Sequence, residues 1–327
     1  MGEFELLARV RERIPRPGPR VLVGSGDDAA VTVAGGATAT SVDALVDGVH
    51  FRRGQASLGQ IGAKALAAAL SDLAAMGAEP GEAYVVLGVP TDLDEDGCLE
   101  LLDGMAAVAA ETGTSLAGGD VSRAPALTLA ITVVGHAAEP GQLIARSGGR
   151  AGDALVLTGE LGGAAAGLFL LEHPGSADGL DADRRTALIS RQLEPRPRLE
   201  AGRALAAAGA TAMIDLSDGL AGDAGQLAAA SGVGAQIDAA ALPVAAGLAE
   251  VAVAAGRDPL ELAASGGEDY ELLAALPAES VAAALASANA EVGVGLTRIG
   301  ELVAGDGVEI RLPDGSTVRS AGFDQLG

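Results

Sequence analysis

Aspartates recur in this chain where a short apolar strand ends or a glycine turn begins. The clearest case is SVDALVDGVHF, residues 41–51, where a strand expected over residues 37–45 carries Asp43 and leads to Asp47 and His50. The intervening Gly48 frees the backbone to turn. Carboxylates gathered at the end of a strand suit a hard cation that also binds phosphate. We therefore expect several such turns, from distant parts of the chain, to converge on one polyphosphate and metal site.

The composition indicates a globular protein and argues against several classes of function. The 327 residues are 49% hydrophobic, which is enough for two domains with separate cores. The formal charge is −23, with 44 acidic against 21 basic residues, and this argues against a nucleic-acid or anionic-membrane surface. Aromatic residues make up only 2%, so base-stacking platforms are not expected.

No segment of the sequence predicts secretion or membrane insertion. The N-terminal stretch carries acids and arginines in an amphipathic pattern and does not resemble a signal peptide. Charged residues or glycine interrupt every alanine-rich stretch before a membrane span of about 18 apolar residues is reached. Cys98 is the only cysteine, which excludes an intrachain disulfide and a cysteine-cluster metal site. We expect a cytoplasmic protein.

Hydrophobic periodicity predicts two domains that mix strands and helices, an α/β (α+β) fold. The Gly-rich polar stretch at about 138–150 marks the expected boundary, which gives an N-terminal domain of residues 1–138 and a C-terminal domain of residues 139–327. Helices are expected over 2–14, 61–76, 98–111 and, interrupted by Pro195 and Pro197, 182–208. Strands are expected over 20–23, 37–45, 84–89, 127–135, 155–158 and 272–276, and Gly118-Gly119-Asp120 is expected to be a glycine turn.

Three features leave two interpretations open. The glycine turn at 159–163 could bind phosphate at a helix N-terminus or could serve close helix–strand packing. Asp218 could be a metal ligand or only the N-cap of the following helix. Asp72 lies near the C-terminal end of its predicted helix, where the helix dipole disfavours an anion. A bound cation or a salt bridge to an arginine would explain it equally well.

The candidate metal ligands are oxygen atoms. The three histidines, His50, His136 and His173, are dispersed along the sequence and form no metal-binding set. Oxygen-only ligation selects Mg²⁺, Mn²⁺ or Ca²⁺ over zinc. The residues by themselves therefore indicate a Mg²⁺-dependent phosphoryl-transfer or nucleotide enzyme.

Seven motifs occur in a characteristic order: GDDAA, SVDALVDGVHF, KALAAALSDLAAMGAEP, GGDVSR, RSGGRAGD, IDLSDGL and SGGEDYEL. In this order the chain resembles the thiamine-monophosphate kinase family, within the ATP-binding superfamily of aminoimidazole-ribonucleotide synthetase. The resemblance implies a PurM-like fold with an N-terminal mixed-sheet domain that dimerises and a C-terminal α/β domain. It also implies a kinase that uses ATP and several Mg²⁺ ions to convert thiamine monophosphate into thiamine diphosphate, the last step of the biosynthesis of that cofactor.

The resemblance also implies which residues bind each ligand, and it implies no catalytic residue beyond these. The metal ligands it implies are Asp28, Ser41, Val42 through its backbone carbonyl, Asp43, Asp72, Asp120, Asp215 and Asp218. The nucleotide-binding residues are Gly119, Asp120, Arg146 and Ser217. The substrate-binding residues are His50, Glu268 and, as an aromatic stacking partner, Phe323. The chain departs from the family at Val42, where threonine is common, and in its GFDQLG ending.

Two other hypotheses remain open at this stage. A sister enzyme, aminoimidazole-ribonucleotide synthetase or selenophosphate synthetase, would share the ATP and Mg²⁺ residues. The pairing of His50 with Glu268 in SGGEDYEL favours the thiamine enzyme. A non-catalytic metal or nucleotide sensor could keep the fold, but the acids are intact across both halves of the chain.

Overall fold

The computed structural model describes residues 9–10, 12–14, 18–23, 30–33, 35–285 and 294–318. Contacts between residues divide the chain into two compact units. The first comprises residues 1–73 and 78–140, and the second comprises residues 74–77 and 141–327. Of the predicted site residues, Asp28 and Phe323 lie outside the described residues, as does most of the predicted helix 2–14.

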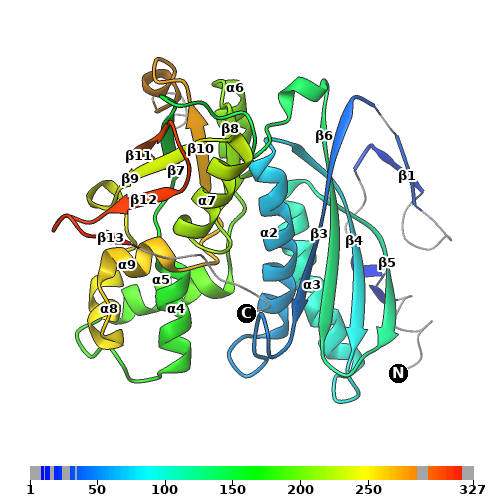
Figure 1. Cartoon of the computed structure of the whole chain (residues 1–327). Coiled ribbons are helices and arrows are strands. Elements are labelled where there is room, and N and C mark those ends of the chain that lie inside the picture. Colours follow the sequence, from blue (N-terminus) through cyan, green and yellow to red (C-terminus); the bar gives the residue numbers. More distant parts are fainter. Residues whose placement is uncertain are drawn as a thin grey trace. The chain divides into compact units, whose positions relative to one another are not determined.

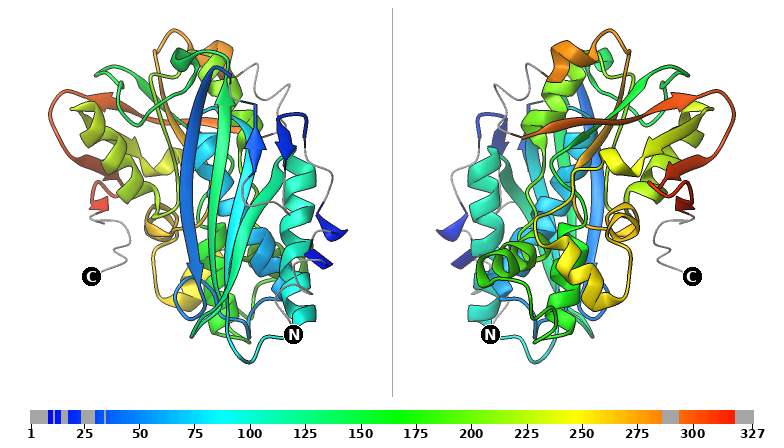
Figure 2. Two further views of the ribbon diagram at one scale, coloured as in Figure 1. Left: turned by 90° about the vertical axis from the view of Figure 1, so that its right-hand side faces the viewer. Right: turned by 90° about the vertical axis from the view of Figure 1, so that its left-hand side faces the viewer.

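A four-stranded sheet with the order β3-β6-β4-β5 forms the centre of the first unit (Figures 1 and 2). Strands β3, β6 and β4 are antiparallel, and the edge strand β5 runs parallel to β4. Alternate residues of β6, Leu129, Ile131 and Val133, are fully buried, which shows that one face of the sheet is covered. The strands of this unit are β1 (Val21–Val23), β2 (Val31–Thr32), β3 (Ala37–Val46), β4 (Glu79–Val89), β5 (Ser115–Arg123) and β6 (Thr128–Ala137).

Two helices of the first unit, α2 (Leu58–Ala75) and α3 (Glu95–Thr112), pack closely against each other. A Cβ atom on Gly62 would lie 1.9 Å from the Leu101 carbonyl oxygen, and one on Gly104 would lie 1.8 Å from the Gly59 carbonyl oxygen. Only glycine therefore permits this approach. The predicted helices 61–76 and 98–111 are confirmed, with each beginning three residues earlier than expected.

The predicted glycine turn at residues 118–120 is wrong, because these residues lie inside β5. A Cβ atom on Gly119 would lie only 2.0 Å from the Val85 carbonyl oxygen of the neighbouring strand. The register between β4 and β5 also shifts between Ala83 and Tyr84. The glycines thus permit a close approach of two strands at an irregularity, and they do not end the strand.

The second unit is built on a seven-stranded sheet with the order β13-β12-β9-β11-β7-β10-β8. Neighbouring strands are antiparallel except β9 and β12, which are parallel. The predicted strand 272–276 is confirmed at both ends. The strands are β7 (Ala154–Thr158), β8 (Ala212–Asp215), β9 (Gly234–Asp238), β10 (Leu272–Leu276), β11 (Leu296–Val303), β12 (Val308–Arg311) and β13 (Thr317–Val318).

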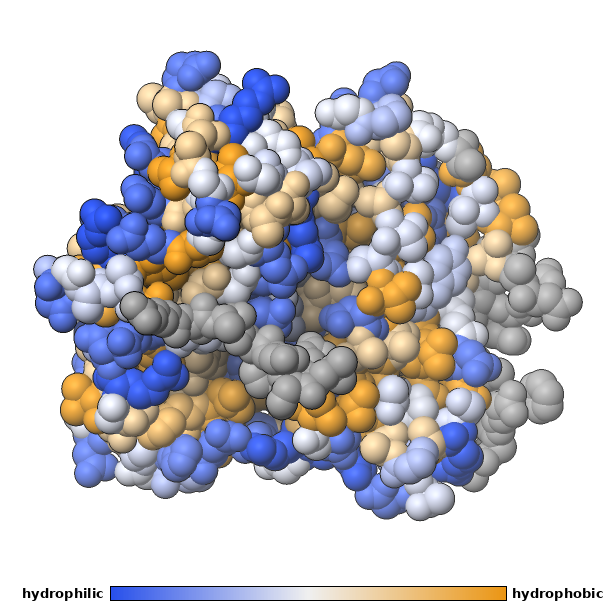
Figure 3. Space-filling view, in the orientation of Figure 1, coloured by the Kyte–Doolittle hydropathy of each residue, from blue (hydrophilic) through white to orange (hydrophobic). Residues whose placement is uncertain are grey.

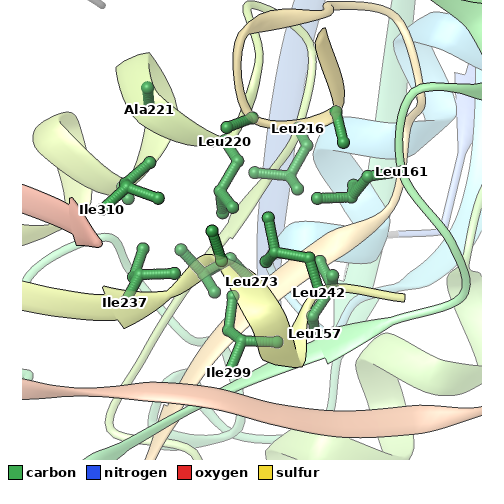
Figure 4. Close-up of a cluster of buried hydrophobic side chains, with 14 of the residues drawn as sticks. Leu157, Leu161, Leu216, Leu220, Ala221, Ile237, Leu242, Leu273, Ile299 and Ile310 are labelled. Atoms are coloured by element: carbon green, nitrogen blue, oxygen red, sulfur yellow. The ribbon is translucent and has the colours of Figure 1, made fainter. Parts of the chain in front are cut away.

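Helices of the second unit pack on this sheet around one hydrophobic core. Figure 4 shows part of that core, where Leu157 and Leu273 of the sheet lie among Leu161, Leu220 and Leu242 from surrounding segments. The predicted interruption at Pro195 and Pro197 is confirmed, because α5 ends and α6 begins on either side of it. The helices are α4 (Gly163–Glu172), α5 (Ala182–Leu193), α6 (Leu199–Ala207), α7 (Leu220–Ser231), α8 (Leu248–Ala255) and α9 (Pro259–Ser265), with short 3₁₀ turns at Pro140–Gln142 and Ala239–Ala241.

Among the described residues, no helix has both the length and the apolar character that a bilayer crossing requires. On the face drawn in Figure 3, hydrophobic residues are interspersed with hydrophilic ones.

Candidate active site

Strand β3 brings two of the predicted ligands to one face of the first sheet. Ser41 and Asp43 are two residues apart and so point to the same side, whereas Val42 points to the other side and is 67% exposed. The Ser41 hydroxyl donates a hydrogen bond to Asp72 Oδ2, which lies on α2. The fold therefore joins two candidate ligands that are 31 residues apart in the sequence.

Asp72 has an unfavourable position for an anion, as the sequence indicated. It lies three residues before the end of α2, whose last turn contains no basic residue. The open alternative was a salt bridge to an arginine. Within the part of the chain that the structure describes, the hydrogen-bond partner of Asp72 is Ser41, and no arginine or lysine forms an ion pair with it. The salt-bridge alternative thus finds no support among the described residues, and the cation alternative stays a prediction.

Asp120 lies on the other edge of the same sheet. The strand register aligns Asp43 with Ile131, Val85 and Gly119, and Asp120 is the next residue along β5. Three strand spacings separate β3 from β5, a distance of about 14 Å along the sheet. One ion cannot contact carboxylates so far apart, so Asp43 and Asp120 would have to bind different ions or different phosphates.

His50 lies in the turn that follows β3, and the backbone fixes its tautomer. The Val46 N–H donates to His50 Nδ1 at 3.1 Å, so the proton of a neutral ring lies on Nε2. This nitrogen is thereby a hydrogen-bond donor. The nearby Asp47 has a structural role, because it accepts a 2.7 Å hydrogen bond from Arg53 Nε.

In the second unit, three carboxylates surround the turn between β8 and α7. Asp215 ends β8 and is buried, and Asp223 Oδ2 accepts a hydrogen bond from the Asp218 N–H at 3.0 Å. Burial, with repulsion from Asp215 and Asp218, raises the pKa of Asp223 to about 7. Burial also raises the pKa of Asp218, which Arg146 partly opposes. The N-cap of α7 is Gly219, so the N-cap interpretation of Asp218 is wrong.

Arg146 provides positive charge close to this acidic turn. Its guanidinium donates a 2.7 Å hydrogen bond from Nη1 to Gln226 Oε1 on α7, and its charge lowers the pKa values of both Asp218 and Asp223. Ser231, also on α7, donates to the Arg146 carbonyl oxygen. The predicted nucleotide-binding arginine and the predicted metal-binding aspartate Asp218 are thus close together.

Residues 266–271, which we call the EDYE loop, run beside the same turn. The backbone N–H groups of Glu268 and Tyr270 donate to the carbonyl oxygens of Ser217 and Leu216, at 2.8 and 2.9 Å. Glu268 and Tyr270 adopt positive φ angles of 64° and 49°, which is rare for residues other than glycine. Such strain persists where the surroundings impose it, and it is typical of binding sites.

The EDYE loop also decides between the two interpretations of the glycine turn at 159–163. Asp269 accepts hydrogen bonds from the Gly162 and Ala164 N–H groups at the start of α4, at 2.7 and 3.0 Å. The N–H groups that could have bound phosphate therefore already bind a carboxylate of the protein. A Cβ atom on Gly163 would lie 2.2 Å from Arg191 Cδ on α5, so the packing interpretation is confirmed.

Sequence reasoning missed several polar residues of this region. Glu271 is 1% exposed and accepts two hydrogen bonds from Arg198, at 2.6 and 2.8 Å, and one from Thr158, at 2.6 Å. Gln192 donates to Glu268 Oε2 at 2.6 Å. The only local signal was the repetition of acids in DLSDGLAGD and GGEDYE.

Within the described ranges, no group of three or more His, Cys, Asp or Glu side chains is arranged to bind a metal ion unaided. The donors nevertheless fit Mg²⁺, which accepts one or two carboxylates and completes its shell with water and substrate phosphates. The mutual repulsion around Asp223 is a second point of fit, since a cation would relieve it.

Two family models match the chain. The AIR synthase related protein, N-terminal domain, matches residues 26–137, and the AIR synthase related protein, C-terminal domain, matches residues 150–313. The Escherichia coli structure of the hydrogenase maturation protein HypE has the same fold, with a TM-score of 0.78 at 22% identity over 98% of this chain and 97% of that one.

Relatives with higher sequence identity share the name thiamine-monophosphate kinase. Thiamine-monophosphate kinase of Rhodopirellula baltica is 35% identical over 94% of this chain and 91% of its own length. The Escherichia coli enzyme of that name is 40% identical over 93% and 91%. The crystal structure of thiamine-monophosphate kinase from Stenotrophomonas maltophilia is 37% identical with a TM-score of 0.84, covering 97% of this chain and 98% of that one. A structure described as AaThiL complexed with AMPPCP and TMP has a TM-score of 0.77 at 29% identity, covering 98% and 94%.

Proposed function

Because this chain belongs to the thiamine-monophosphate kinase family, we propose that it transfers the γ-phosphoryl group of ATP to thiamine monophosphate and forms thiamine diphosphate. The observation that carries the proposal is 35–40% identity to proteins of that name over more than nine-tenths of their length. The relative whose structure is named with AMPPCP and TMP supports ATP and thiamine monophosphate as the two substrates.

The reaction needs phosphate positioning more than it needs a base. The acceptor is itself a phosphate monoester with a second pKa of about 6, so it is largely dianionic at neutral pH. No residue has to remove a proton from it. The difficulty is to bring two anions together, in line with the bond that breaks. We therefore propose direct transfer, without a phosphorylated protein intermediate, and assign no general base.

Mg²⁺ is the ion we propose for the carboxylates. We propose that several such ions bind, held by Asp28, Ser41, the Val42 carbonyl, Asp43, Asp72 and Asp120 of the first unit and by Asp215 and Asp218 of the second. When bound, the ions would neutralise phosphate oxygens and align the attacking and leaving groups. Arg146 would add positive charge to the polyphosphate, and Gly119 and Ser217 would contact the nucleotide.

We further propose that His50 and Glu268 bind thiamine monophosphate, and that Phe323 stacks on it. His50 Nε2–H suits a phosphate oxygen, and the Glu268 carboxylate suits the amino group of the pyrimidine. We also propose a homodimer formed through the N-terminal domain, residues 1–138, in the cytoplasm. The C-terminal domain, residues 139–327, would complete the nucleotide and substrate site.

One assay tests the function. ADP release is measured with ATP and Mg²⁺ in the presence of thiamine monophosphate or of thiamine, and the product is identified by mass. Thiamine diphosphate formed from the monophosphate alone is the expected result. Turnover of free thiamine would contradict the assigned acceptor. No turnover with either acceptor would favour a sister enzyme or a sensor, and a labelled protein after incubation with ATP alone would exclude direct transfer.

A further inference from the structure

Gln192 is a buried polar residue that the proposed reaction does not use. It lies near the C-terminal end of α5 and is 5% exposed. Its side-chain nitrogen Nε2 donates a 2.6 Å hydrogen bond to Glu268 Oε2, across 76 residues of sequence. Glu268 is the residue to which we assign the amino group of the substrate.

The oxygen of the Gln192 amide does not contribute to the stability of the fold. Its Oε1 atom is buried and accepts no hydrogen bond from any residue that the structure describes. A buried acceptor without a partner is unfavourable, and an apolar side chain of the same shape would avoid that penalty. The hydrogen bond that the Gln192 nitrogen donates to Glu268 therefore explains why a glutamine stands at this position.

The packing of α5 against α4 holds Gln192 at this depth. A Cβ atom on Gly167 would lie 2.1 Å from the Leu188 carbonyl oxygen and 3.0 Å from Gln192 Cβ. One residue before Gln192, Arg191 donates to the carbonyl oxygen and to the carboxylate of Glu160, at 3.0 and 2.6 Å. The glutamine is thus placed by backbone contacts on one side and an ion pair on the other.

The residues that flank Glu268 are fixed in the same way. Its own N–H binds the Ser217 carbonyl oxygen, Asp269 caps α4, and Glu271 binds Arg198 and Thr158. These contacts set the backbone of the EDYE loop. The hydrogen bond from Gln192 acts on the Glu268 side chain itself and favours one direction of its carboxylate.

We propose that Gln192 is a positioning residue that orients the Glu268 carboxylate toward the aminopyrimidine of thiamine monophosphate, and thereby sets the affinity for the acceptor but not for ATP. This inference rests on the proposed function. A carboxylate that rotated freely would lose conformational entropy each time the substrate bound, and this would lower the affinity for the substrate. Holding the Glu268 side chain in one rotamer before binding reduces that loss.

The test compares Gln192→Met with Gln236→Met. Methionine has nearly the shape of glutamine and lacks the donor. Gln236 is a matched control, since its Nε2 also donates to a glutamate, Glu309, at an exposed site of the same unit. For Gln192→Met we expect the KM for thiamine monophosphate to rise roughly tenfold, the loss of one hydrogen bond to a charged group. We expect kcat and the KM for ATP to stay at the wild-type values and the thermal unfolding midpoint to stay at or above its wild-type value. All four quantities should stay unchanged in Gln236→Met.

A double-mutant cycle then identifies the route of the effect. If Gln192 acts through Glu268, Gln192→Met changes the acceptor KM by less than about twofold once Glu268→Gln is present. An unchanged acceptor KM in the single variant overturns the inference. So does a lowered unfolding midpoint with equal losses for both substrates, which is the signature of a merely structural role. A wild-type chain that forms no thiamine diphosphate overturns the proposed function as well, whereas an active wild type with an unaffected Gln192→Met overturns this inference alone.

Discussion

Ser41 on strand β3 donates a hydrogen bond to Asp72 near the C-terminal end of helix α2. The serine holds a carboxylate where the helix dipole opposes it, and α2 has no basic residue in its last turn. An arrangement that lowers stability at a fixed position is typical of a functional site. Asp72 should therefore contribute to activity at the expense of stability.

Asp72→Asn tests this trade-off. The amide oxygen can still accept from Ser41, and the negative charge is gone. We expect the free energy of unfolding to rise by about 0.5 kcal/mol, within the usual range for a charge at a helix end. We expect kcat to fall by at least roughly 100-fold, since a metal ligand is lost. Denaturant unfolding and ADP release measure the two effects. Asp103→Asn, on the exposed side of α3, is the control, and a fully active Asp72→Asn variant would refute the assignment.

Asp43 and Asp47 are four residues apart and should respond differently to the same substitution. Asp43 shares a face of β3 with Ser41, whereas Asp47 binds Arg53. We expect Asp43→Asn to lower kcat by roughly 100-fold or more and to raise the Mg²⁺ concentration needed for half-maximal rate. Asp47→Asn should leave the Mg²⁺ dependence unchanged. Rates measured over a Mg²⁺ titration distinguish the two, and equal titration curves for Asp43→Asn and the wild type would exclude Asp43 as a ligand.

Elements with strong local patterns could be predicted from the sequence. The strand 272–276, a continuous apolar run between Glu271 and Pro277, agrees with the structure at both ends. The helices at 58–75 and 95–112 were also found. Strand β9 and helices α8 and α9 were not predicted. α8 is half alanine and carries little periodicity, and α9 is only seven residues long. β9 depends on pairing with β11 and β12, which are distant in the sequence.

The residues of the candidate site likewise divide into those that a local motif reveals and those that only the fold brings to the site. Asp43, Asp215 and Glu268 lie in motifs whose residue order is itself informative. Gln192, Arg198 and Thr158 lie in no such motif, and each acquires its role only when the chain brings it to the EDYE loop. Contacts of this kind, across more than 70 residues, leave no local periodicity or spacing to detect.

The ion pair between Arg198 and Glu271 should contribute strongly to the stability of the second unit. Glu271 is 1% exposed, and among the described residues removal of the arginine would leave its buried carboxylate with Thr158 as the remaining hydrogen-bond donor. We expect Arg198→Met to lower the free energy of unfolding by about 3 kcal/mol, the usual result of breaking a buried pair. Arg311→Met, which breaks the exposed pair with Glu309, should change it by less than about 0.5 kcal/mol. Equal losses in the two variants, measured by denaturant unfolding, would contradict the structural role of the buried pair.

Asp269 should make stability depend on pH. Burial raises its pKa from the ordinary value of 3.8 to about 7, and the hydrogen bonds from Ala164 and Gly162 only partly oppose this. Between these two pH values the folded protein binds a proton at Asp269 that the unfolded chain has lost. The contribution of this group to stability is therefore greatest at acidic pH and falls as pH rises from about 4 to about 7.

Asp269→Asn isolates this contribution, because other titrating groups are common to both proteins. We expect the unfolding free energy of the wild type minus that of Asp269→Asn to fall with increasing pH, by up to about 1.4 kcal/mol per unit between pH 4 and 7. Above pH 7 the difference should level off. Denaturant unfolding of both proteins at each pH gives the difference directly. A difference that stays constant, or that rises with pH, would mean that the folded protein holds Asp269 ionised at the start of α4, through its hydrogen bonds to Gly162 and Ala164.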